Sequence, residues 1–346
     1  MPSHPEIFKH RKELLQMTLS QIVEHRRREH ANPGARMKTT DMVRIAGGDF
    51  IMGSDRHYPE EAPAHAVSVD SFWIDRFPVT NAEFAVFVEE TEYVTLAERP
   101  PDPALYPDAD PKFLIPASVV FQKPAGRVDM GNHCNWWRYV PGANWRRPLG
   151  PRSGLKGKAK HPVVHIGFED AEAYAAWAGK ELPTEAEWEF AARGGLRDAD
   201  FAWGDELMPG SQFMANTWQG EFPWENLQCA GFEGTSPVGL FPSNGYGLHD
   251  MIGNVWEWTI DWYSAHHEAS PSCCDGAHNP RCGERDGSFD PRQPGIKIPC
   301  RVMKGGSYLC APNYCERYRP AARMAQRIDT ATCHLGFRCI TREAKV

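Results

Sequence analysis

Short stretches in which hydrophobic and polar residues alternate begin near Val43 and predict strands. Residues 42–54 (MVRIAGGDFIMGS) and 65–79 (HAVSVDSFWIDRFPV) place apolar side chains at about every second position, as half-buried strands do. In residues 161–180 a short apolar strand is followed by a helical period that ends at Gly179. The chain therefore mixes short strands with short helices.

Two helix starts carry a clear capping signal. Thr80 and Glu83 form a capping-box pattern, so we expect a helix over residues 80–91. Thr184 and Glu187 repeat the pattern, and glycines follow that stretch at 194 and 195. The 30 glycines and 29 prolines of the chain exceed average usage. We find no internal repeat, and we predict that residues 41–346 form one irregular, loop-rich α+β domain.

Residues 1–40 form a separate N-terminal segment. Phe8, Leu15, Leu19 and Ile22 make one apolar stripe, which predicts a helix over residues 6–30 followed by a linker. This helix either packs on the main domain or contacts a partner. No apolar run approaches the ~18 residues that span a membrane, and the segment does not resemble a signal peptide. We therefore expect a cytoplasmic protein that does not bind membranes.

The net charge bears on possible binding partners, and the cysteine content bears on possible metal or redox sites. The net charge of −7 argues against nucleic-acid binding. In a reducing compartment, the 10 cysteines should be mostly free thiols or metal ligands. Cys310 and Cys315 lie five positions apart in KGGSYLCAPNYCERYRPAAR, with the turn signal Pro312-Asn313 between them. A bend there would bring the thiols together as a small disulfide, a soft-metal site or a redox pair; otherwise they are two unrelated buried cysteines.

A second candidate site lies in NGYGLHDMIGNVWEW, residues 244–258. Asp250, Asn254 and Glu257 bring hard oxygen donors close together in a glycine-rich stretch, which is typical of a calcium site. The spacing does not match an EF-hand loop. The same residues also occur as ordinary turn and cap residues, so the pattern leaves both interpretations open.

Several segments, taken in order, resemble one family. The chain contains GGDFIMGS, FPVTNAEFAVFV, PGANWRRPLGP, HPVVHIGFEDAEAYAAWAGKELPTEAEWEFAARGG, NGYGLHDMIGNVWEW, KGGSYLCAPNYCERYRPAAR and LGFRC. Over about residues 43–340 it closely resembles the formylglycine-generating enzymes, or sulfatase-modifying factors, of the bacterial type. The wider superfamily also includes non-enzymes and iron-dependent sulfoxide synthases. The cysteine pair marks the formylglycine-generating branch.

The resemblance implies a fold, a reaction and partners. The fold would be irregular and related to C-type lectins. The enzymes of this family oxidise a cysteine in a Cys-x-Pro-x-Arg segment of an unfolded sulfatase to Cα-formylglycine. They use O₂, Cu(I) and an external thiol reductant, and Ca²⁺ is a second metal of the family. Client identity, reductant and oligomeric state do not follow from the sequence.

Residue roles follow from the same resemblance. It implies catalytic roles for Cys310, Cys315 and Ser307, the two cysteines being the copper ligands. The residues that it places at the substrate are Trp136, as a flat platform, Arg323 and His334. Independently of the resemblance, we expect Arg317, Arg319 and Arg323 to favour thiolates by their positive potential.

The implied calcium ligands are the side chains of Asp250 and Glu257 and the carbonyls of Gly253 and Val255. Asn216 matches one ligand of a second calcium site in some members. That site is doubtful because Ala230 stands where those members carry an aspartate.

Two rival functions remain. An iron-dependent sulfoxide synthase would need a histidine motif in an extra helical domain, and His25 and His30 have the wrong spacing for one helix face. A non-catalytic binding module of the same fold would not need paired cysteines.

Overall fold

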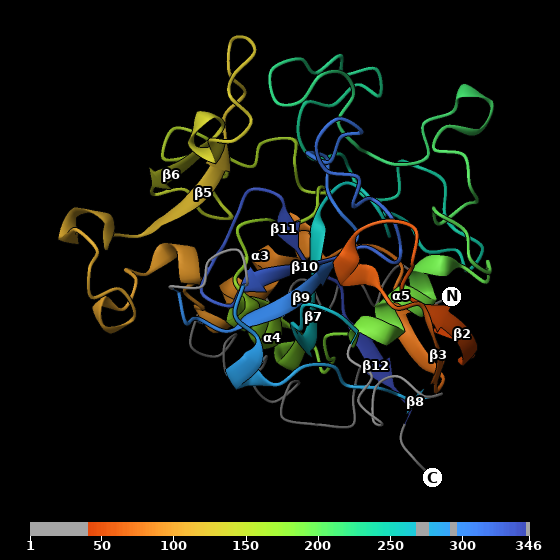
Figure 1. Cartoon of the computed structure of the whole chain (residues 1–346). Coiled ribbons are helices and arrows are strands. Elements are labelled where there is room, and N and C mark those ends of the chain that lie inside the picture. The colour runs from red at the N-terminus through yellow and green to blue at the C-terminus, as the bar shows by residue number, and fades with distance from the viewer. Residues whose placement is uncertain (1–40, 268–276, 291–295, 344–346) are drawn as a thin grey trace, which may run out of the picture. The chain divides into compact units, whose positions relative to one another are not determined.

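The computed structural model describes residues 41–267, 277–290 and 296–343 (Figure 1). The expected N-terminal helix and linker lie outside the described residues. The longer helices are α3 (Asn81–Thr91), α4 (Phe168–Trp177) and α5 (Glu185–Arg193). The strands are β1 (Met42–Ile45), β2 (Gly48–Met52), β3 (His65–Val69), β4 (Phe72–Asp75), β5 (Ala117–Phe121), β6 (Trp137–Pro141), β7 (Trp256–Trp262), β8 (Ala277–His278), β9 (Cys300–Lys304), β10 (Arg323–Arg327), β11 (Leu335–Gly336) and β12 (Ile340–Arg342).

The strands form four small sheets. Their orders are β1-β4-β12, β10-β9-β7-β11, β2-β3-β8 and β5-β6. In the second sheet β7, β9 and β10 are antiparallel, and β11 runs parallel to β7. Figure 1 shows this sheet at the centre, with long loops above it. The loop-rich α+β fold predicted from the glycine and proline content is confirmed.

The predicted helix starts are also confirmed. The Thr80 hydroxyl accepts the Glu83 N–H, and the Glu83 carboxylate accepts the Thr80 N–H. Thr184 and Glu187 make the same pair of bonds at α5. These caps satisfy backbone N–H groups that a helix start leaves unpaired. In both cases a local sequence pattern was enough, because all the atoms involved lie within one turn.

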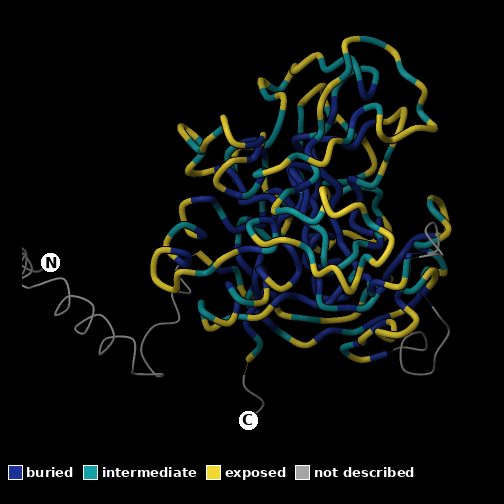
Figure 2. Tube along the Cα trace, turned by 90° about the vertical axis from the view of Figure 1, so that its left-hand side faces the viewer, coloured by how far each residue is buried: buried dark blue, intermediate teal, exposed yellow. Residues whose placement is uncertain are grey.

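The main hydrophobic core packs α3 and α4 against the sheets. Phe84 contacts the rings of Trp145, Tyr174 and Phe337 at centroid distances of 5.2–6.4 Å. Figure 2 shows this buried interior beneath loops whose outer residues are exposed. Among the described residues, no helix is long and apolar enough to cross a membrane.

Helix α5 is buried along its whole length although it carries four charged residues. The carboxylate of Glu185 binds Arg323 through two bonds of 2.7 and 2.9 Å, and Lys304 lies 3.5 Å away. Glu189 accepts bonds from Lys304 at 2.9 Å and from Arg193 at 2.7 Å. Each buried charge thus has an opposite partner, which buried charges require.

Lys304 and Arg323 are cross-strand partners at the end of β9 and the start of β10. Residues 305–322, which contain Cys310 and Cys315, are therefore the loop that joins two adjacent antiparallel strands. We call residues 305–322 the cysteine loop. The two residues that flank it, Lys304 and Arg323, are both held by the carboxylate of Glu185.

We predict that Lys304→Met strongly destabilises the fold. The change leaves the buried carboxylates of Glu185 and Glu189 short of one cation, and breaking a buried ion pair costs about 3–5 kcal/mol. Urea unfolding would show a lower midpoint. The matched control is Lys112→Met, which removes an exposed pair with Asp110 and should leave the urea midpoint almost unchanged, because water screens exposed ion pairs. Equal midpoints for the two variants would contradict the role of Lys304.

A second prediction concerns acid stability. Burial by itself would raise the pKa of Glu185, but Arg323 and Lys304 lower that pKa from 4.5 to about 2. Because the folded-state pKa is depressed, the stabilisation is complete above about pH 4.5 and is lost as the pH falls towards about 2. We expect the melting temperature to fall less steeply over this range in Glu185→Gln than in the wild type. Parallel curves would count against this titration.

Candidate active site

The cysteine loop leaves β9 through two glycines that no other residue can replace without strain. Gly305 and Gly306 have φ angles of +94° and +69°. A Cβ on Gly305 would lie 2.8 Å from the carbonyl oxygen of Met251 and 3.0 Å from the Trp188 ring. A Cβ on Gly306 would lie 2.8 Å from the carbonyl oxygen of Arg317, at the far end of the same loop. The glycines thus let the loop pack against itself.

The two thiols of the loop converge. The N–H groups of Tyr314 and Cys315 both donate to the carbonyl of Ala311, which closes a tight turn. This turn brings the sulfur atoms of Cys310 and Cys315 to 3.4 Å. The distance is much longer than the ~2.05 Å of a disulfide, so the two side chains are free thiols that face each other. The bend predicted at Pro312-Asn313 is confirmed.

The environments of the two sulfurs differ. Cys310 is buried, and this burial raises the pKa of its thiol well above the ordinary value. The pKa of Cys315 is lowered, because its sulfur accepts a hydrogen bond from Cys310 and lies 3.9 Å from Nη1 of Arg317. One thiol of the pair is therefore poised to ionise before the other.

Arg317 is held in place by a segment distant in sequence. Its guanidinium forms an ion pair with Glu60 and lies over the Tyr58 ring at 3.7 Å. The hydroxyl of Tyr58 also accepts the N–H of Glu316 at 3.2 Å. The expected positive charge beside the thiols is thus supplied by Arg317.

Ser307 lies beside Cys310, the buried member of the thiol pair. It is fully buried, and its N–H lies 3.4 Å from the sulfur of Cys310. Its hydroxyl oxygen accepts the N–H of Leu309 at 3.2 Å. The structure therefore brings together Ser307, Cys310 and Cys315, the three residues to which the resemblance gives catalytic roles.

The tip of the turn between the two cysteines is hydrogen-bonded to the segment that contains Phe222. The side-chain amide of Asn313 accepts the N–H of Phe222 and donates to its carbonyl, both at 3.2 Å. The backbone N–H of Trp218 donates to the carbonyl of Cys310 at 2.9 Å. These bonds fix the turn relative to an aromatic cluster that Trp136, Trp218, Phe222 and Tyr308 form.

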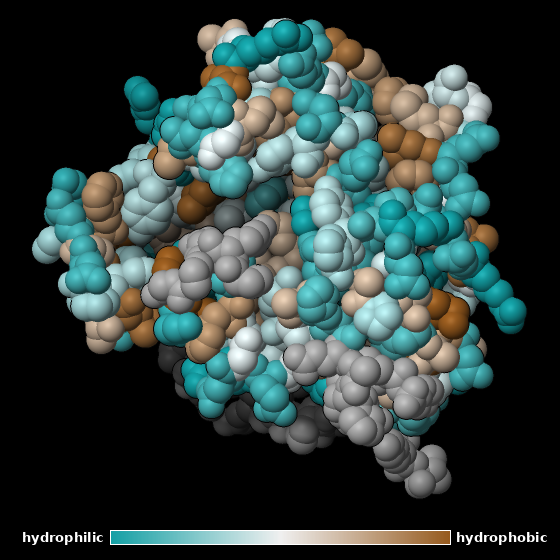
Figure 3. Space-filling model, in the orientation of Figure 1, coloured by the Kyte–Doolittle hydropathy of each residue, from teal (hydrophilic) through white to brown (hydrophobic). Residues whose placement is uncertain are grey.

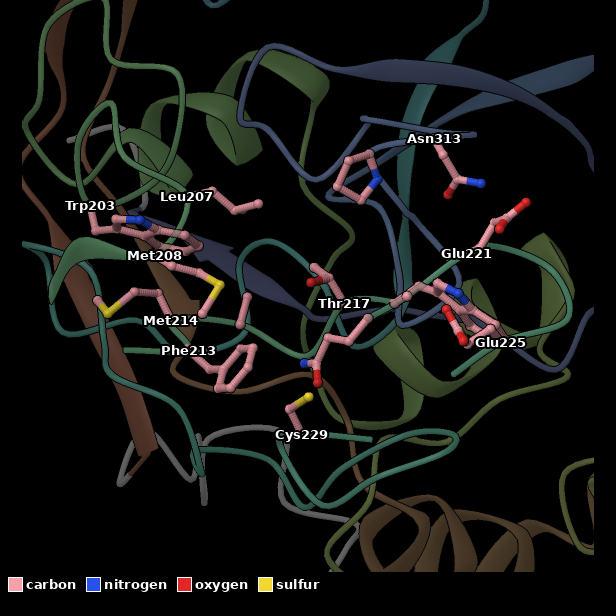
Figure 4. Close-up of a pocket in the computed structure, with 15 residues that line it drawn as sticks. Trp203, Leu207, Met208, Phe213, Met214, Thr217, Glu221, Glu225, Cys229 and Asn313 are labelled. Atoms are coloured by element: carbon pink, nitrogen blue, oxygen red, sulfur yellow. The ribbon is translucent and has the colours of Figure 1, made fainter. Parts of the chain in front are cut away.

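A pocket of about 520 Å³ borders this turn at Pro312 and Asn313. Figure 4 shows Trp203 and Met208 along one side of it, and Glu221 and Glu225 on another. A larger cavity of about 990 Å³ lies elsewhere, and neither cysteine lines it. Figure 3 shows apolar side chains in a hollow to the left of centre on the face drawn there. Cavity size alone therefore does not find the thiol pair.

Trp136 belongs to the aromatic cluster but is not the open platform that the sequence suggested. It has 0% exposed surface, because the rings of Phe222 and Tyr314 cover it at centroid distances of 5.7 Å. Tyr314, within the cysteine loop, is 37% exposed and stacks on Phe222 at 4.3 Å. The aromatic surface open to solvent is thus that of Tyr314.

His334 lies at the edge of this cluster. Its ring is 5.1 Å from that of Trp137, and Nδ1 lies 2.6 Å from the hydroxyl of Thr332. Burial lowers the pKa of His334 to about 3. The imidazole is therefore neutral at physiological pH and can take part in a hydrogen bond without adding charge to the site.

Arg323 does not lie where the sequence analysis expected it. It is fully buried at the start of β10, and Glu185 and the carbonyl of Ser264 bind its guanidinium. A side chain without exposed surface cannot reach a peptide from solvent, so Arg323 holds the loop instead. Arg319 is likewise occupied by a two-point ion pair with Glu61. Of the three arginines, Arg317 is the one whose guanidinium lies beside the thiol pair, 3.9 Å from the sulfur of Cys315.

The candidate calcium loop is buried and rich in oxygen atoms. Asp250 accepts the N–H of Gly239 at 2.8 Å, and burial raises the pKa of its carboxyl. Within the described part of the chain, the carbonyls of Gly253 and Val255 accept no hydrogen bond. The hydroxyl of Ser236, which lies beside Asn254, has no partner there either. These oxygen donors fit a hard cation.

Glu257 fits less well. Its carboxylate accepts bonds of 2.7 and 2.8 Å from Arg338 and a bond of 2.7 Å from the Trp188 indole. Across the described ranges, no three His, Cys, Asp or Glu side chains form a metal-binding group. A cation here would therefore depend on carbonyl oxygens and on Asp250, with Glu257 shared with Arg338.

Asn216 lies against this loop, not at a site of its own. Its carbonyl accepts the N–H of Asn254 at 2.8 Å, and its amide donates to the carbonyl of Gly234 at 2.9 Å. At position 230, alanine supplies no side-chain oxygen. Nothing in this arrangement supports the doubtful second calcium site.

Sequence reasoning missed the residues that hold the site from a distance. Tyr58 and Glu60 contact the cysteine loop, and Glu185 contacts Arg323 directly after it, all across more than 130 positions. No local motif signals such contacts. Tyr314 could have been noticed as an aromatic residue between the two cysteines.

Comparison with known proteins agrees with this geometry. Residues 27–343 match the family model of the sulfatase-modifying factor enzyme 1-like domain. The chain is 53% identical to the formylglycine-generating enzyme of Mycobacterium tuberculosis over 87% of its own length and 97% of that protein. It is 39% identical to the inactive C-alpha-formylglycine-generating enzyme 2 of Mus musculus, over 86% and 84% of the two chains.

A solved structure agrees in fold alone. PvdO from Pseudomonas aeruginosa superposes with a TM-score of 0.55 at 23% identity, over 87% of this chain and 94% of that one. The family model, by contrast, spans all of the described residues. The chain therefore belongs to the sulfatase-modifying factor family, the family of the formylglycine-generating enzymes.

Proposed function

We propose that this chain is a copper-dependent oxidase that converts the cysteine of a Cys-x-Pro-x-Arg segment in an unfolded sulfatase to Cα-formylglycine. Family membership supports the reaction. Because the family also contains relatives named inactive, membership alone does not decide turnover. The observation that carries the proposal is the pair of free thiols, Cys310 and Cys315, that face each other at 3.4 Å.

The reaction has a simple balance. In the substrate side chain, the C–S bond and one C–H bond break and a C=O bond forms. One atom of O₂ enters the aldehyde and the other leaves as water, while the sulfur leaves as H₂S. An external thiol reductant supplies the two electrons and two protons still required, and it leaves as a disulfide. The chain needs a site that admits a thiol and O₂ together.

The thiol pair fits Cu(I), a soft cation that prefers thiolate ligands. When bound, copper would supply the one-electron chemistry with O₂ that amino-acid side chains lack. Cys310 and Cys315 would hold it, and the guanidinium of Arg317 favours the ionised form of Cys315. The backbone N–H of Ser307 lies 3.4 Å from the sulfur of Cys310 and orients it, while the hydroxyl of Ser307 accepts the N–H of Leu309.

The substrate would lie as an extended peptide across the exposed turn. Tyr314 offers the open aromatic surface, supported from below by Phe222 and by Trp136. Neutral His334 adds a polar edge to the same cluster. Aromatic surfaces bind extended chains with little loss of conformational entropy.

We predict that Cys310→Ser and Cys315→Ser each lose tight copper binding and at least about 100-fold in peptide turnover, since serine cannot replace a thiolate on Cu(I). Bound copper and aldehyde formation in a Cys-x-Pro-x-Arg peptide would be measured by metal analysis and mass spectrometry. The matched controls Cys333→Ser and Cys339→Ser alter buried thiols outside the pair and should keep copper.

Two results would contradict this assignment. Full copper and full turnover in either member of the pair would remove it from the site. Copper binding without turnover in the wild type would favour the non-catalytic module, in line with the inactive relatives. Loss of folding in a variant is detected separately by its melting temperature.

We further propose that Ca²⁺ binds the loop of Asp250, Gly253, Val255 and Glu257 and acts structurally. The support is a buried carboxylate next to two carbonyls that accept no hydrogen bond within the described residues. A bound cation would link the start of β7 to the residues before it. Its effect on catalysis would be indirect, through the position of the neighbouring cysteine loop, because the N–H of Gly253 donates to the carbonyl of Gly305.

We predict that Ca²⁺ at about 100 times its dissociation constant raises the melting temperature by about 5 °C. Asp250→Ala should abolish this dependence, while Asp198→Ala, at an exposed position, should keep it. Thermal unfolding with calcium and with chelator measures the effect. A wild-type curve that the chelator leaves unmoved would show that this loop does not bind calcium.

A further inference from the structure

A strongly basic segment follows directly after the aromatic cluster. Residues 138–160, which we call the basic lobe, contain seven cationic and no acidic residues. The cations are Arg138, Arg146, Arg147, Arg152, Lys156, Lys158 and Lys160. The whole chain carries −7, so the rest of it, without these cations, carries −14. The lobe is therefore a local exception in an acidic protein.

These cations are largely unneutralised. Within the described residues, the lobe makes one ion pair, from Arg146 to Glu98. Arg147 donates to the carbonyl of Pro151 at 2.6 Å, which fixes its position without cancelling its charge. Except for Lys158, which is half-buried, the seven cationic residues are exposed. Leu149 stands among them with 65% of its surface exposed, the largest value among the exposed hydrophobic residues described.

The first half of the lobe has a fixed shape. Trp145 is buried against Phe84, and the guanidinium of Arg146 lies over its other side at 4.3 Å. Gly150 comes so close to Val140 that a Cβ on it would lie 2.9 Å from that side chain. The cations are thus presented on an ordered surface, which lowers the entropy lost when a partner binds.

The lobe directly follows the candidate substrate surface in the sequence. It begins one residue after Trp137, whose ring contacts His334. The preceding Trp136 contacts Tyr314 of the cysteine loop. Figure 1 shows β6, where the lobe starts, at the upper left. Gly150 packs against Val140 of β6, so part of the lobe lies against the strand that carries Trp137. A peptide that lies across Tyr314 and His334 would reach the lobe along this strand.

We propose that the basic lobe binds an acidic stretch of the client polypeptide that flanks its Cys-x-Pro-x-Arg segment. This inference rests on the proposed function and adds a second recognition element to it. A short acidic flank would bind the cations of the lobe and the exposed Leu149. Salt ions in solution screen its repulsion by the net charge of −14 on the rest of the chain. A long polyanion such as RNA would meet that negative charge as well, so a peptide fits better.

The experiment uses the full chain loaded with copper and two sets of peptides. All contain the Cys-x-Pro-x-Arg core, and each carries either an acidic Asp/Glu flank or a neutral Ser/Asn flank, at the N- or C-terminal side. At low salt we expect KM to be about tenfold lower for an acidic flank on one side, with the preference lost above about 0.5 M salt. The kcat should not depend on the flank.

Two triple variants test whether the basic lobe causes the preference for acidic flanks. In Arg147→Gln/Arg152→Gln/Lys156→Gln, the ratio of KM values for neutral and acidic flanks should fall to about one. The matched control Arg44→Gln/Lys112→Gln/Arg197→Gln removes the same charge from exposed positions outside the lobe and should keep the ratio. Melting temperatures establish that both variants are folded.

Each outcome is decisive. Equal KM values for acidic and neutral flanks in the wild type would overturn the inference and leave the proposed function intact. A preference that persists in the lobe variant would place recognition elsewhere. Tighter, lobe-dependent binding of a short RNA than of the acidic peptide would replace the peptide with a nucleic acid as partner. Failure of the wild type to turn over any peptide would instead reject the proposed function, and with it this inference.

Discussion

The candidate site depends on one buried carboxylate. Glu185, at the start of α5, holds Arg323 by two bonds and lies 3.5 Å from Lys304, and these two residues flank the cysteine loop. A loop of irregular conformation needs such a constraint, because its own backbone bonds do not define one shape. The fully buried position of α5 excludes water from this contact and so strengthens it.

Within that frame, local contacts set the chemistry. The carbonyl of Ala311 closes the turn, and Asn313 attaches the turn to Phe222. The two sulfurs that result are chemically unequal, since one is buried and the other lies beside a guanidinium. Arg317 reaches that place because Glu60, from a distant segment, holds it. The thiol pair is thus local in sequence, but its electrostatic environment is not.

This division explains what the sequence could predict. The capping boxes at Thr80 and Thr184, the turn between the cysteines and the loop-rich α+β fold depend on neighbouring residues, and all were found correctly. Arg323 was assigned to the substrate from the family resemblance, whereas strand pairing places it at the start of β10, where Glu185 of α5 binds it. The exposure of Trp136 could not be predicted either, since the side chains that cover it come from two other segments.

The buried ion pairs also set how the site responds to heat. The free-energy penalty for removing charged groups from water falls as temperature rises, whereas hydrophobic stabilisation per unit area levels off. The contact between Glu185 and Arg323 therefore keeps its strength on warming better than the packing around Phe222 does. On heating, the ion pair of Glu185 with Arg323 is thus among the last contacts of the site to weaken. The two residues that flank the cysteine loop, Lys304 and Arg323, therefore stay next to each other as cross-strand partners while the protein warms.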